Sequence, residues 1–317
     1  MAYATVADGV ELYYEVLEPP SHPVSNPDTV VFLNGLTMDT TAWAAVREYF
    51  SADYRTLVYD ARGQGRSSTP VGPYTPEQHA SDLLALLAHL GNDSLSDDSH
   101  EDGHDLGALH LVGLSNGGLV AMLVAAQLTD EPERVQSVSV IDSFLGVDPM
   151  LRTILDSWKS ALAAGGSALR FDVATPWVWG HSFLNRHYQD VLSFRERAAE
   201  RDPDVIRYLI DGLLGFSGAH KALRAYNGPL LAAVGQEDIL TPLRYSHDIV
   251  EWARHGVLVK IDQAGHAAPI ERPDAVARVV RGFIGRRQEF MTPLFPGGRT
   301  RRRHDPHERR WRLRRPR

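Results

Sequence analysis

The sequence predicts an α/β protein with a mostly parallel sheet, helices on both faces of that sheet and a helical cap inserted after the sixth strand. Short apolar runs rich in β-branched residues alternate with helical patterns from residue 29 onward. Strands that are apolar on both faces are typical of parallel sheets buried between layers of helices. The alternation stops over residues 143–226, where helix formers and three tryptophans occur with few strand signals. This interruption predicts the helical cap.

Each predicted element has its own signal in the sequence. The N-terminal segment alternates around Asp8-Gly9, which predicts an antiparallel hairpin of two strands. Residues 76–90 predict a helix, because Pro76 suits a first turn and the leucines that follow it form one apolar stripe. Another helix is predicted over residues 116–128. The strands expected after the hairpin cover residues 29–33, 55–59, 109–114, 135–142, 229–235 and 257–261.

These elements divide the 317 residues into three parts. Residues 1–142 and 227–290 form the expected core, and residues 143–226 form the cap. Residues 291–317 are expected to be a disordered basic tail, since residues 299–317 hold ten arginines and only two acids. Such a tail could bind nucleic acid or an acidic surface. Because it has no folded recognition motif, we favour a solvated segment and expect no nucleic-acid partner.

The composition excludes several classes of site. The chain has no cysteine, which excludes disulfides, thiolate metal sites and a cysteine nucleophile. The longest nearly apolar stretch, residues 117–128, is shorter than the roughly 20 residues that cross a bilayer. No secretory signal is visible. We therefore expect a cytoplasmic protein that acts on a small molecule without a membrane partner, and its oligomeric state stays open.

No cofactor and no metal are expected. The sequence has neither a glycine-rich dinucleotide fingerprint nor a phosphate-binding loop. His100 and His104 lie in an acidic stretch at residues 93–105 and could bind a metal. Histidines without packed neighbours hold no fixed geometry, so we favour a flexible acidic loop.

The motif Gly-Leu-Ser-Asn-Gly at residues 113–117 stands between a predicted strand and a predicted helix. A serine on such a sharp turn needs small residues two positions before and after it, because neighbouring chain comes close there. The turn would hold Ser115 above the strand ends as a nucleophile. The amide of Asn116, at a helix N-terminus, would face a developing oxyanion. The alternative is an ordinary glycine-rich turn without chemistry.

With this strand–turn–helix motif, the chain resembles the α/β-hydrolase superfamily in its serine-nucleophile branch of esterases, enol-lactonases and haloperoxidase-like hydrolases. The resemblance covers about residues 2–286 in the expected order. Asn34-Gly35-Leu36 is similar to the family's His-Gly-x oxyanion loop, which implies that the Leu36 amide is the second oxyanion donor. Asn34 departs from the usual histidine. Residues 60–67, DARGQGRS, are similar to the family's D-x-R-G-x-G-x-S turn, which implies a structural role.

The resemblance also assigns an acid and a base. Asp238 follows the strand at residues 229–235, where the family carries its triad acid, and His266 follows the last strand, where the family carries its histidine. The order serine, aspartate, histidine is the one this fold requires. A serine hydroxyl needs an imidazole to take its proton, and the imidazole needs a carboxylate to fix its tautomer. Asp142, at the end of the preceding strand, stays open as an alternative acid, and Glu237 is expected to point elsewhere.

The expected function is hydrolysis of a small, partly apolar carboxylic ester or lactone through an acyl-enzyme on Ser115. Trp177, Trp179 and Phe183 of the cap are candidate substrate-binding residues, although aromatic residues at helical spacing usually pack in a core. Two alternatives stay open. An acyltransferase would use the same triad to pass the acyl group to an alcohol, thiol or carrier. A non-catalytic protein on this fold would bind a small molecule without chemistry.

Overall fold

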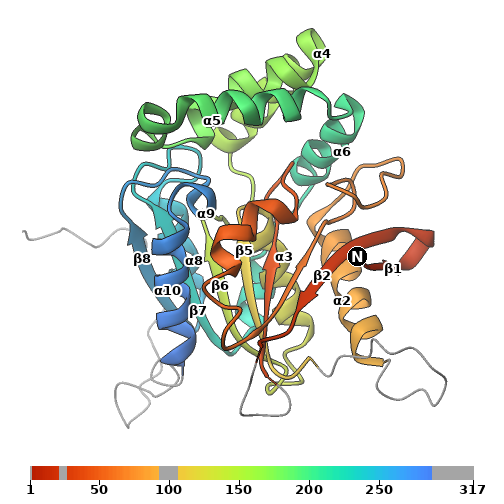
Figure 1. Ribbon diagram of the computed structural model, residues 1–317, viewed down its shortest axis with the longest axis vertical. Helices are drawn as coiled ribbons and strands as arrows, with labels where there is room; N and C mark the ends of the chain where they lie inside the picture. Colours follow the sequence, from red (N-terminus) through yellow and green to blue (C-terminus); the bar gives the residue numbers. More distant parts are fainter. Residues whose placement is uncertain (1, 21–26, 93–105, 288–317) are drawn as a thin grey trace, which may run out of the picture.

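The computed structural model describes residues 2–20, 27–92 and 106–287 (Figure 1). The predicted basic tail and the acidic stretch with His100 and His104 lie outside the described residues. Eight strands form one sheet in the spatial order β1-β2-β4-β3-β5-β6-β7-β8, in which β2 pairs antiparallel with β1 and β4 and all other neighbours are parallel. The strands are β1 (Ala2–Thr5), β2 (Glu11–Leu17), β3 (Thr29–Leu33), β4 (Arg55–Tyr59), β5 (Leu109–Leu114), β6 (Val135–Ile141), β7 (Pro229–Gly235) and β8 (His255–Ile261).

Helices connect the parallel strands and cover both faces of the sheet (Figure 1). Among the described residues, no helix is both long enough and apolar enough to cross a membrane. The helices outside the cap are α1 (Ala44–Arg47), α2 (Pro76–Asn92), α3 (Asn116–Gln127), α7 (His220–Ala225), α8 (Leu243–Trp252), α9 (Ala268–Glu271) and α10 (Pro273–Gly285), with the short 3-10 helices η1 (Ala7–Gly9) and η2 (Thr40–Trp43).

Successive residues of the central strands enter two hydrophobic cores on opposite faces of the sheet. Val30 and Phe32 of β3 belong to the core that includes Val276 of α10. Val31 and Leu33 belong to the other core, which contains residues of α2, α3, α7 and α8. The alternation follows from the two-residue period of a strand. Burial of both faces explains why the sequence of β3 is apolar throughout.

The predicted fold class is confirmed, and the strands after the hairpin match their expected ranges with two differences at their ends. Strand β6 ends at Ile141, one residue earlier than expected, because Asp142 leaves the strand with a φ of 48°. Strand β8 begins at His255, two residues earlier than expected, because His255 and Gly256 continue the parallel register with β7. Helix α8, between these last two strands, has no counterpart in the prediction.

Three helices form the cap at one end of the sheet (Figure 1): α4 (Pro149–Val178), α5 (His181–Ala199) and α6 (Pro203–Leu214). Asp148 and Asp202 accept backbone N–H bonds at the starts of α4 and α6, each directly before a proline that suits the first turn. The remaining helix of the predicted cap region, α7, packs against α3 of the core. The helices that cover the site therefore end at Leu214, short of the predicted boundary at residue 226.

Asp60 organises the turn at residues 60–67. Its carboxylate accepts the backbone amide of Thr40 at 2.7 Å and that of Arg66 at 2.9 Å. A Cβ at Gly65 would lie 2.2 Å from the same carboxylate, so this position excludes a side chain. These contacts agree with the structural role that the sequence implies for the turn.

Replacement of Arg62 by methionine is expected to lower the free energy of unfolding by about 3 kcal/mol, because it leaves the buried carboxylate of Asp82 unpaired. The Arg62 Nε and Nη2 atoms donate to the two oxygens of Asp82 at 2.8 and 2.7 Å. Urea denaturation at pH 7 measures the change. Arg207→Met is the control, since Arg207 pairs with Asp204 at the surface, and its denaturation midpoint should stay close to that of the wild type. Equal losses in the two variants would contradict the prediction.

Candidate active site

Ser115 lies on a strained turn between β5 and α3. Its backbone angles, φ 54° and ψ −117°, fall in a region that few residues adopt. A Cβ at Gly113 would lie 2.3 Å from the carbonyl oxygen of Gly117, and a Cβ at Gly117 would lie 2.3 Å from that of Leu33. Both glycines are therefore required by close contact, as the motif implies. The turn presents the serine at the carboxyl end of the central strands.

The structure brings the three predicted catalytic residues together in one hydrogen-bonded row. His266 Nε2 lies 3.0 Å from Ser115 Oγ, and His266 Nδ1 lies 3.0 Å from Asp238 Oδ2. The aspartate accepts a hydrogen bond from Nδ1–H, which leaves the unprotonated Nε2 to accept a hydrogen bond from the serine hydroxyl. His266 is 6% exposed and Asp238 is 4% exposed, so water is largely excluded from the bond between them.

Asp238 is held in its charged form by several donors. Its Oδ1 accepts the backbone amides of Leu240 and Thr241 at 2.8 and 2.9 Å, and its Oδ2 accepts the Thr241 hydroxyl at 2.7 Å. Burial alone would raise the pKa of Asp238, but the neighbouring His266 and these hydrogen bonds hold the pKa below its usual range. The carboxylate is thus able to stabilise a positive charge on the imidazole.

Asp142, the alternative acid, makes no hydrogen bond to His266. It is fully buried, and its Oδ1 accepts the amide of Gly235 at 2.7 Å. Burial, together with the negative charge of Asp238, raises the pKa of Asp142 well above its usual value. Because His266 Nδ1 bonds to Asp238 and not to Asp142, the geometry favours Asp238 as the acid.

The loop after β3 lies directly against the serine. A Cβ at Gly35 would approach the Ser115 Cβ to 3.5 Å, and Leu36 lines the same cavity as the serine. Within the described residues, neither the Leu36 amide nor the Asn116 amide donates to a protein acceptor. Both predicted oxyanion donors are therefore available to a ligand. The Asn34 side chain donates to the carbonyl of Tyr59 at 3.0 Å, so it joins the ends of β3 and β4.

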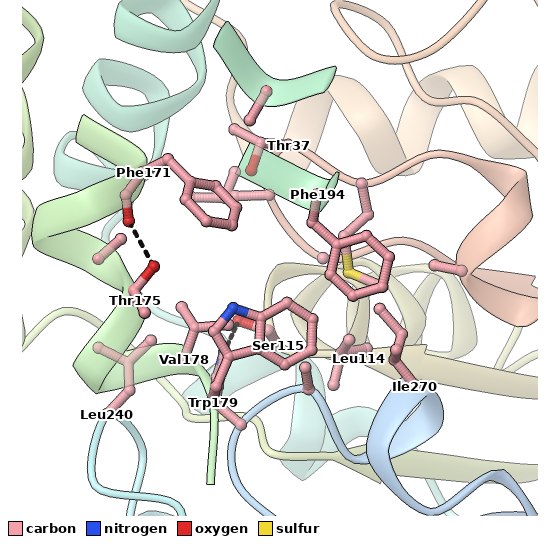
Figure 2. Close-up of a pocket in the computed structure, with 18 of the residues that line it drawn as sticks. Thr37, Leu114, Ser115, Phe171, Thr175, Val178, Trp179, Phe194, Leu240 and Ile270 are labelled. Atoms are coloured by element: carbon pink, nitrogen blue, oxygen red, sulfur yellow. Dashed lines mark hydrogen bonds between the residues drawn. The ribbon is translucent and has the colours of Figure 1, made fainter. Parts of the chain in front are cut away.

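A cavity of about 510 Å³ lies between the cap and Ser115 (Figure 2). Its wall is mainly apolar. Thr37 and Ser115 belong to the core, Trp179 and Phe194 belong to the cap, and all four side chains lie around the cavity (Figure 2). On each side of the break at Gly165–Gly166, the residues of α4 that line the cavity lie three or four positions apart, so one face of each half of the helix meets it. They are Leu151, Leu155, Trp158, Ser167, Arg170, Phe171, Ala174, Thr175 and Val178.

Of the three predicted substrate-binding aromatics, Trp179 lines this cavity, whereas Trp177 and Phe183 are not among its lining residues. Trp177 lies off the lining face of α4 and packs against the hydrophobic core. Phe183 stacks on Trp179 with ring centres 5.2 Å apart, so it supports the cavity wall from behind. Phe194, which the sequence did not single out, stacks on the same indole at 5.3 Å and does line the cavity.

The junction between α4 and α5 is tied to the loop that carries His266. The backbone amide of His266 donates to the carbonyl of Val178 at 2.9 Å. The buried carboxylate of Glu271 accepts the amides of Gly265 at 2.8 Å and Gly180 at 3.2 Å. The cap and the loop of His266 therefore share one set of hydrogen bonds.

Glu237 forms a second connection between the cap and the loop that carries Asp238. It follows Gln236 in the loop after β7 and precedes Asp238, but its carboxylate points to the cap, as expected. It accepts the backbone amide of Ser182 at 2.7 Å and the Ser182 hydroxyl at 2.5 Å. Glu237, next to Asp238, and Glu271, near His266, thus both accept backbone amides at the start of α5.

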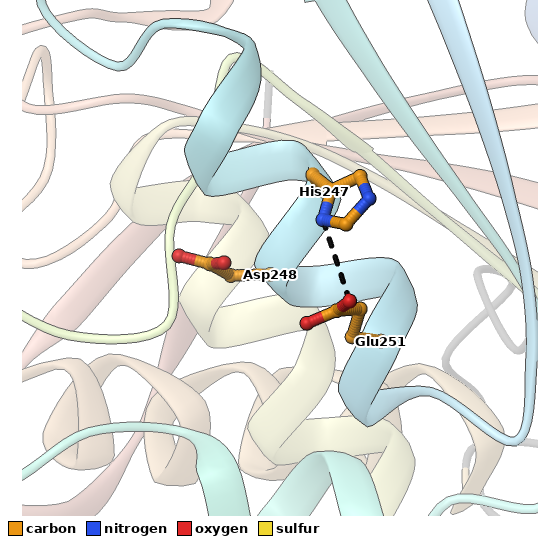
Figure 3. A group of neighbouring side chains, drawn as sticks. All are labelled: His247, Asp248 and Glu251. Carbon is orange, nitrogen blue, oxygen red and sulfur yellow. Dashed lines mark ion pairs between the residues drawn. The ribbon is translucent and has the colours of Figure 1, made fainter. Parts of the chain in front are cut away.

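A separate group of His247, Asp248 and Glu251 lies on the surface of α8 (Figure 3). One possible ligand atom from each side chain lies within 4.8 Å of the others, a spacing that a metal ion could use. All three side chains are exposed, and His247 Nδ1 already lies 3.7 Å from a carboxylate oxygen of Glu251 as an ion pair. Because water competes for every ligand at this exposed surface, we assign no metal site to the group.

The sheet order, the cap and the serine–histidine–aspartate row together define an α/β-hydrolase architecture. Residues 30–279 match the alpha/beta hydrolase family, and the chain belongs to this family. The resemblance that the sequence motifs imply is thereby confirmed.

Several other members of the family are similar to this chain over most of their length. A putative carbamate hydrolase RutD from Caulobacter sp. (strain K31) is 25% identical over 276 residues, which cover 86% of this chain and 95% of the relative. The 3-oxoadipate enol-lactonase 2 of Acinetobacter baylyi is 24% identical over 284 residues, which cover 88% of this chain and 95% of the relative. The solved structure of a thermophilic esterase from Thermogutta terrifontis has a TM-score of 0.75 at 24% identity and covers 92% of this chain and 99% of its own.

Asp238→Asn is expected to lower kcat about 10³–10⁴-fold, because an amide would neither fix the tautomer of His266 nor stabilise its cation. Asp142→Asn is the matched control. Asp142 does not bond to His266, and the amide oxygen of asparagine can still accept the Gly235 amide, so this variant should change kcat by less than about tenfold. Steady-state hydrolysis of a 4-nitrophenyl ester by the two folded variants measures both effects. A large loss in Asp142→Asn alone would reassign the acid.

Glu271→Gln is expected to change how stability depends on pH. Burial raises the pKa of Glu271 to about 7 from the usual 4.5, so the folded state keeps a proton that the unfolded state releases between these values. The stabilisation by this proton is complete below about pH 4.5 and is lost as the pH rises through 7. Glutamine does not titrate, so the free energy of unfolding of the variant minus that of the wild type should rise by up to about 3 kcal/mol between pH 4.5 and a pH above 7. Urea denaturation at pH 5, 6, 7 and 8 measures the difference, and a difference that stays constant with pH would contradict the prediction.

Proposed function

We propose that this protein is a serine hydrolase that cleaves a small, partly apolar carboxylic ester or lactone through an acyl-enzyme on Ser115. The observation that carries the proposal is the row of hydrogen bonds from Ser115 through His266 to Asp238, with a distance of 3.0 Å at each step. A serine hydroxyl is a weak nucleophile near neutral pH, and an imidazole in this position removes its proton as it attacks.

In the first half of the reaction, Ser115 Oγ attacks the carbonyl carbon of the substrate while its proton passes to His266 Nε2. The imidazolium is stabilised by Asp238 across the hydrogen bond to Nδ1. The negative charge on the former carbonyl oxygen is stabilised by the backbone amides of Leu36 and Asn116. Collapse of this intermediate breaks the bond to the alcohol oxygen, which takes the proton from His266 and leaves.

In the second half, a water molecule attacks the acyl carbon. His266 now takes the proton of that water, and the same two amides stabilise the second oxyanion. Collapse releases the carboxylic acid and returns the proton to Ser115. With a lactone, the alcohol and the acid remain parts of one product molecule.

The cavity supports a substrate of modest size that is apolar in part. Its volume of about 510 Å³ lies in the range typical of small-molecule sites, and its apolar wall includes Trp179, Phe194 and Leu240. The names of the relatives, a carbamate hydrolase and an enol-lactonase, describe hydrolysis of acyl compounds by proteins of this family. We extend the reaction class, and not their particular substrates, to this chain.

The test is labelling with a fluorophosphonate probe, followed by mapping of the modified peptide. Wild type is expected to be labelled at Ser115, whereas Ser115→Ala and His266→Ala should lose the label and at least about 10⁴-fold in kcat for 4-nitrophenyl butyrate. Product analysis in the presence of methanol or a thiol separates hydrolysis from acyl transfer, because a transferase would yield the new ester or thioester as its main product. A folded wild type without labelling or turnover would refute the proposal in favour of a binding protein.

A further inference from the structure

Arg170 is a buried cation that the proposed reaction leaves without a role. It lies on α4, is 7% exposed, and lines the cavity that contains Ser115. Its Nη2 donates to Thr37 Oγ1 at 3.0 Å. Its Nε has no acceptor, and within the described residues no carboxylate lies at ion-pair distance from it.

The lack of a carboxylate partner distinguishes Arg170 from the other buried arginines in the described part of the chain. Arg201, which also lines the cavity, forms an ion pair with Asp39 at 3.0 Å. Every other arginine buried as deeply as Arg170 also has a carboxylate partner. These pairs are Arg47–Glu15 at 2.8 Å, Arg55–Glu18 at 2.6 Å and Arg62–Asp82 at 2.7 Å.

A buried charge without a counter-ion is costly, so the missing partner of Arg170 calls for an explanation. Burial and the nearby charge of Arg201 lower the pKa of Arg170 to about 10, which leaves the guanidinium charged at neutral pH. The ring of Trp158 offers a weak contact only, with its centre 5.4 Å from the guanidinium carbon. An anion that enters the cavity would supply the missing charge and occupy the free donors.

We propose that Arg170 binds a carboxylate on the acyl part of the substrate, so that the preferred substrates are esters and lactones whose acyl chain carries a second carboxylate. This inference rests on the proposed function. A guanidinium presents its donors in a plane that matches two carboxylate oxygens, and it discriminates against a neutral group of the same size.

The position of Arg170 limits the distance between this carboxylate and the reacting carbonyl. Its partner Thr37 directly follows Leu36, the proposed oxyanion donor, and adjacent Cα atoms are about 3.8 Å apart. With the 3.0 Å bond to Thr37, standard bond lengths allow at most about 14 Å between the guanidinium carbon and the oxyanion. An acyl chain with about four methylene groups between its two carboxyl carbons, as in adipate, fits within this limit.

The burial of Arg170 favours recognition of the acyl part over the alcohol. The alcohol must leave before water can reach the acyl-enzyme, whereas the acyl part stays attached to Ser115 through both halves of the reaction. A cation buried in the cavity wall suits the group that stays. A charge bound there would also hold the acyl chain in place while water attacks.

The opposing explanation is that Arg170 only supports Thr37 and the oxyanion loop. Two substrates of nearly equal size distinguish these roles: mono-4-nitrophenyl adipate, which carries a carboxylate, and 4-nitrophenyl methyl adipate, in which a methyl ester replaces it. Four variants complete the experiment. They are Arg170→Met, Arg170→Lys, Thr37→Val, which removes the hydroxyl partner alone, and Arg152→Met, which removes an arginine from the exposed side of α4.

Wild type is expected to prefer the charged adipate ester by about 10–100-fold in kcat/KM, the range expected for a charge-assisted hydrogen bond. Arg170→Met should abolish this preference, mainly through KM, and leave kcat for the neutral ester within about threefold of wild type. Arg170→Lys should keep part of the preference. Arg152→Met should keep it in full, and Thr37→Val, which removes the hydrogen bond that orients the guanidinium, should lower it without abolishing it. Equal losses on both esters in Arg170→Met, or a wild type without preference, would overturn the inference.

A binding measurement without turnover separates this inference from the proposed function. In the Ser115→Ala background, calorimetric titration with monomethyl adipate is expected to give at least tenfold tighter binding than dimethyl adipate, and Arg170→Met should remove the difference. Selective binding in a protein whose Ser115 is neither labelled nor catalytic would uphold the carboxylate site and refute the hydrolase. Ester turnover without selective binding would do the reverse.

Discussion

The close contact of three chain segments around Ser115 is the constraint on which the site depends. Gly113, Gly117 and the end of β3 lie so near one another that no side chain fits at either glycine. This contact forces Ser115 into its strained backbone conformation and brings the loop that begins at Gly35 beside it. The positions of Ser115 and of both proposed oxyanion donors are thus set by the packing of backbone against backbone, which leaves little freedom for them to move apart.

The catalytic row and the cavity wall come from different parts of the chain. Ser115, Asp238 and His266 follow β5, β7 and β8, so the parallel sheet alone brings them to one edge. The cap supplies about half of the residues that line the cavity. The two parts meet through Glu237 and Glu271, whose carboxylates lie next to the acid and base loops and hold backbone amides at the start of α5. Placement of the cap and alignment of the histidine are therefore mechanically linked.

Local sequence predicts those features that depend on local geometry. The strands, the nucleophile turn and the positions of Asp238 and His266 follow from apolar runs and from motifs at strand ends, and the structure places them as expected. The hydrogen bond from Thr241 to Asp238 could have been predicted in the same way, because a hydroxyl three residues after an aspartate can donate back to it.

Features that depend on distant pairing were not predictable. Glu271 accepts a hydrogen bond from Gly180, which lies 91 residues earlier in the chain. Arg170 donates one to Thr37, which lies 133 residues earlier. The face of α4 that lines the cavity is also set by a break in the helix at Gly165–Gly166, where φ and ψ leave helical values. The periodicity of the sequence alone therefore could not show that Trp177 points away from the cavity while Trp179 lines it.

The bond from His266 to Val178 has a consequence for how such a protein can diversify. The acceptor is a backbone carbonyl, which every amino acid provides, so mutation of residue 178 need not break the bond. Neighbouring side chains of the cap can drift during evolution and reshape the cavity while the histidine keeps its anchor. Substitutions in the cap can therefore change the shape of the cavity without moving His266, although the cap and the loop of His266 remain in direct contact. A family built on this arrangement can acquire new substrates by substitutions in the cap without rebuilding its chemistry.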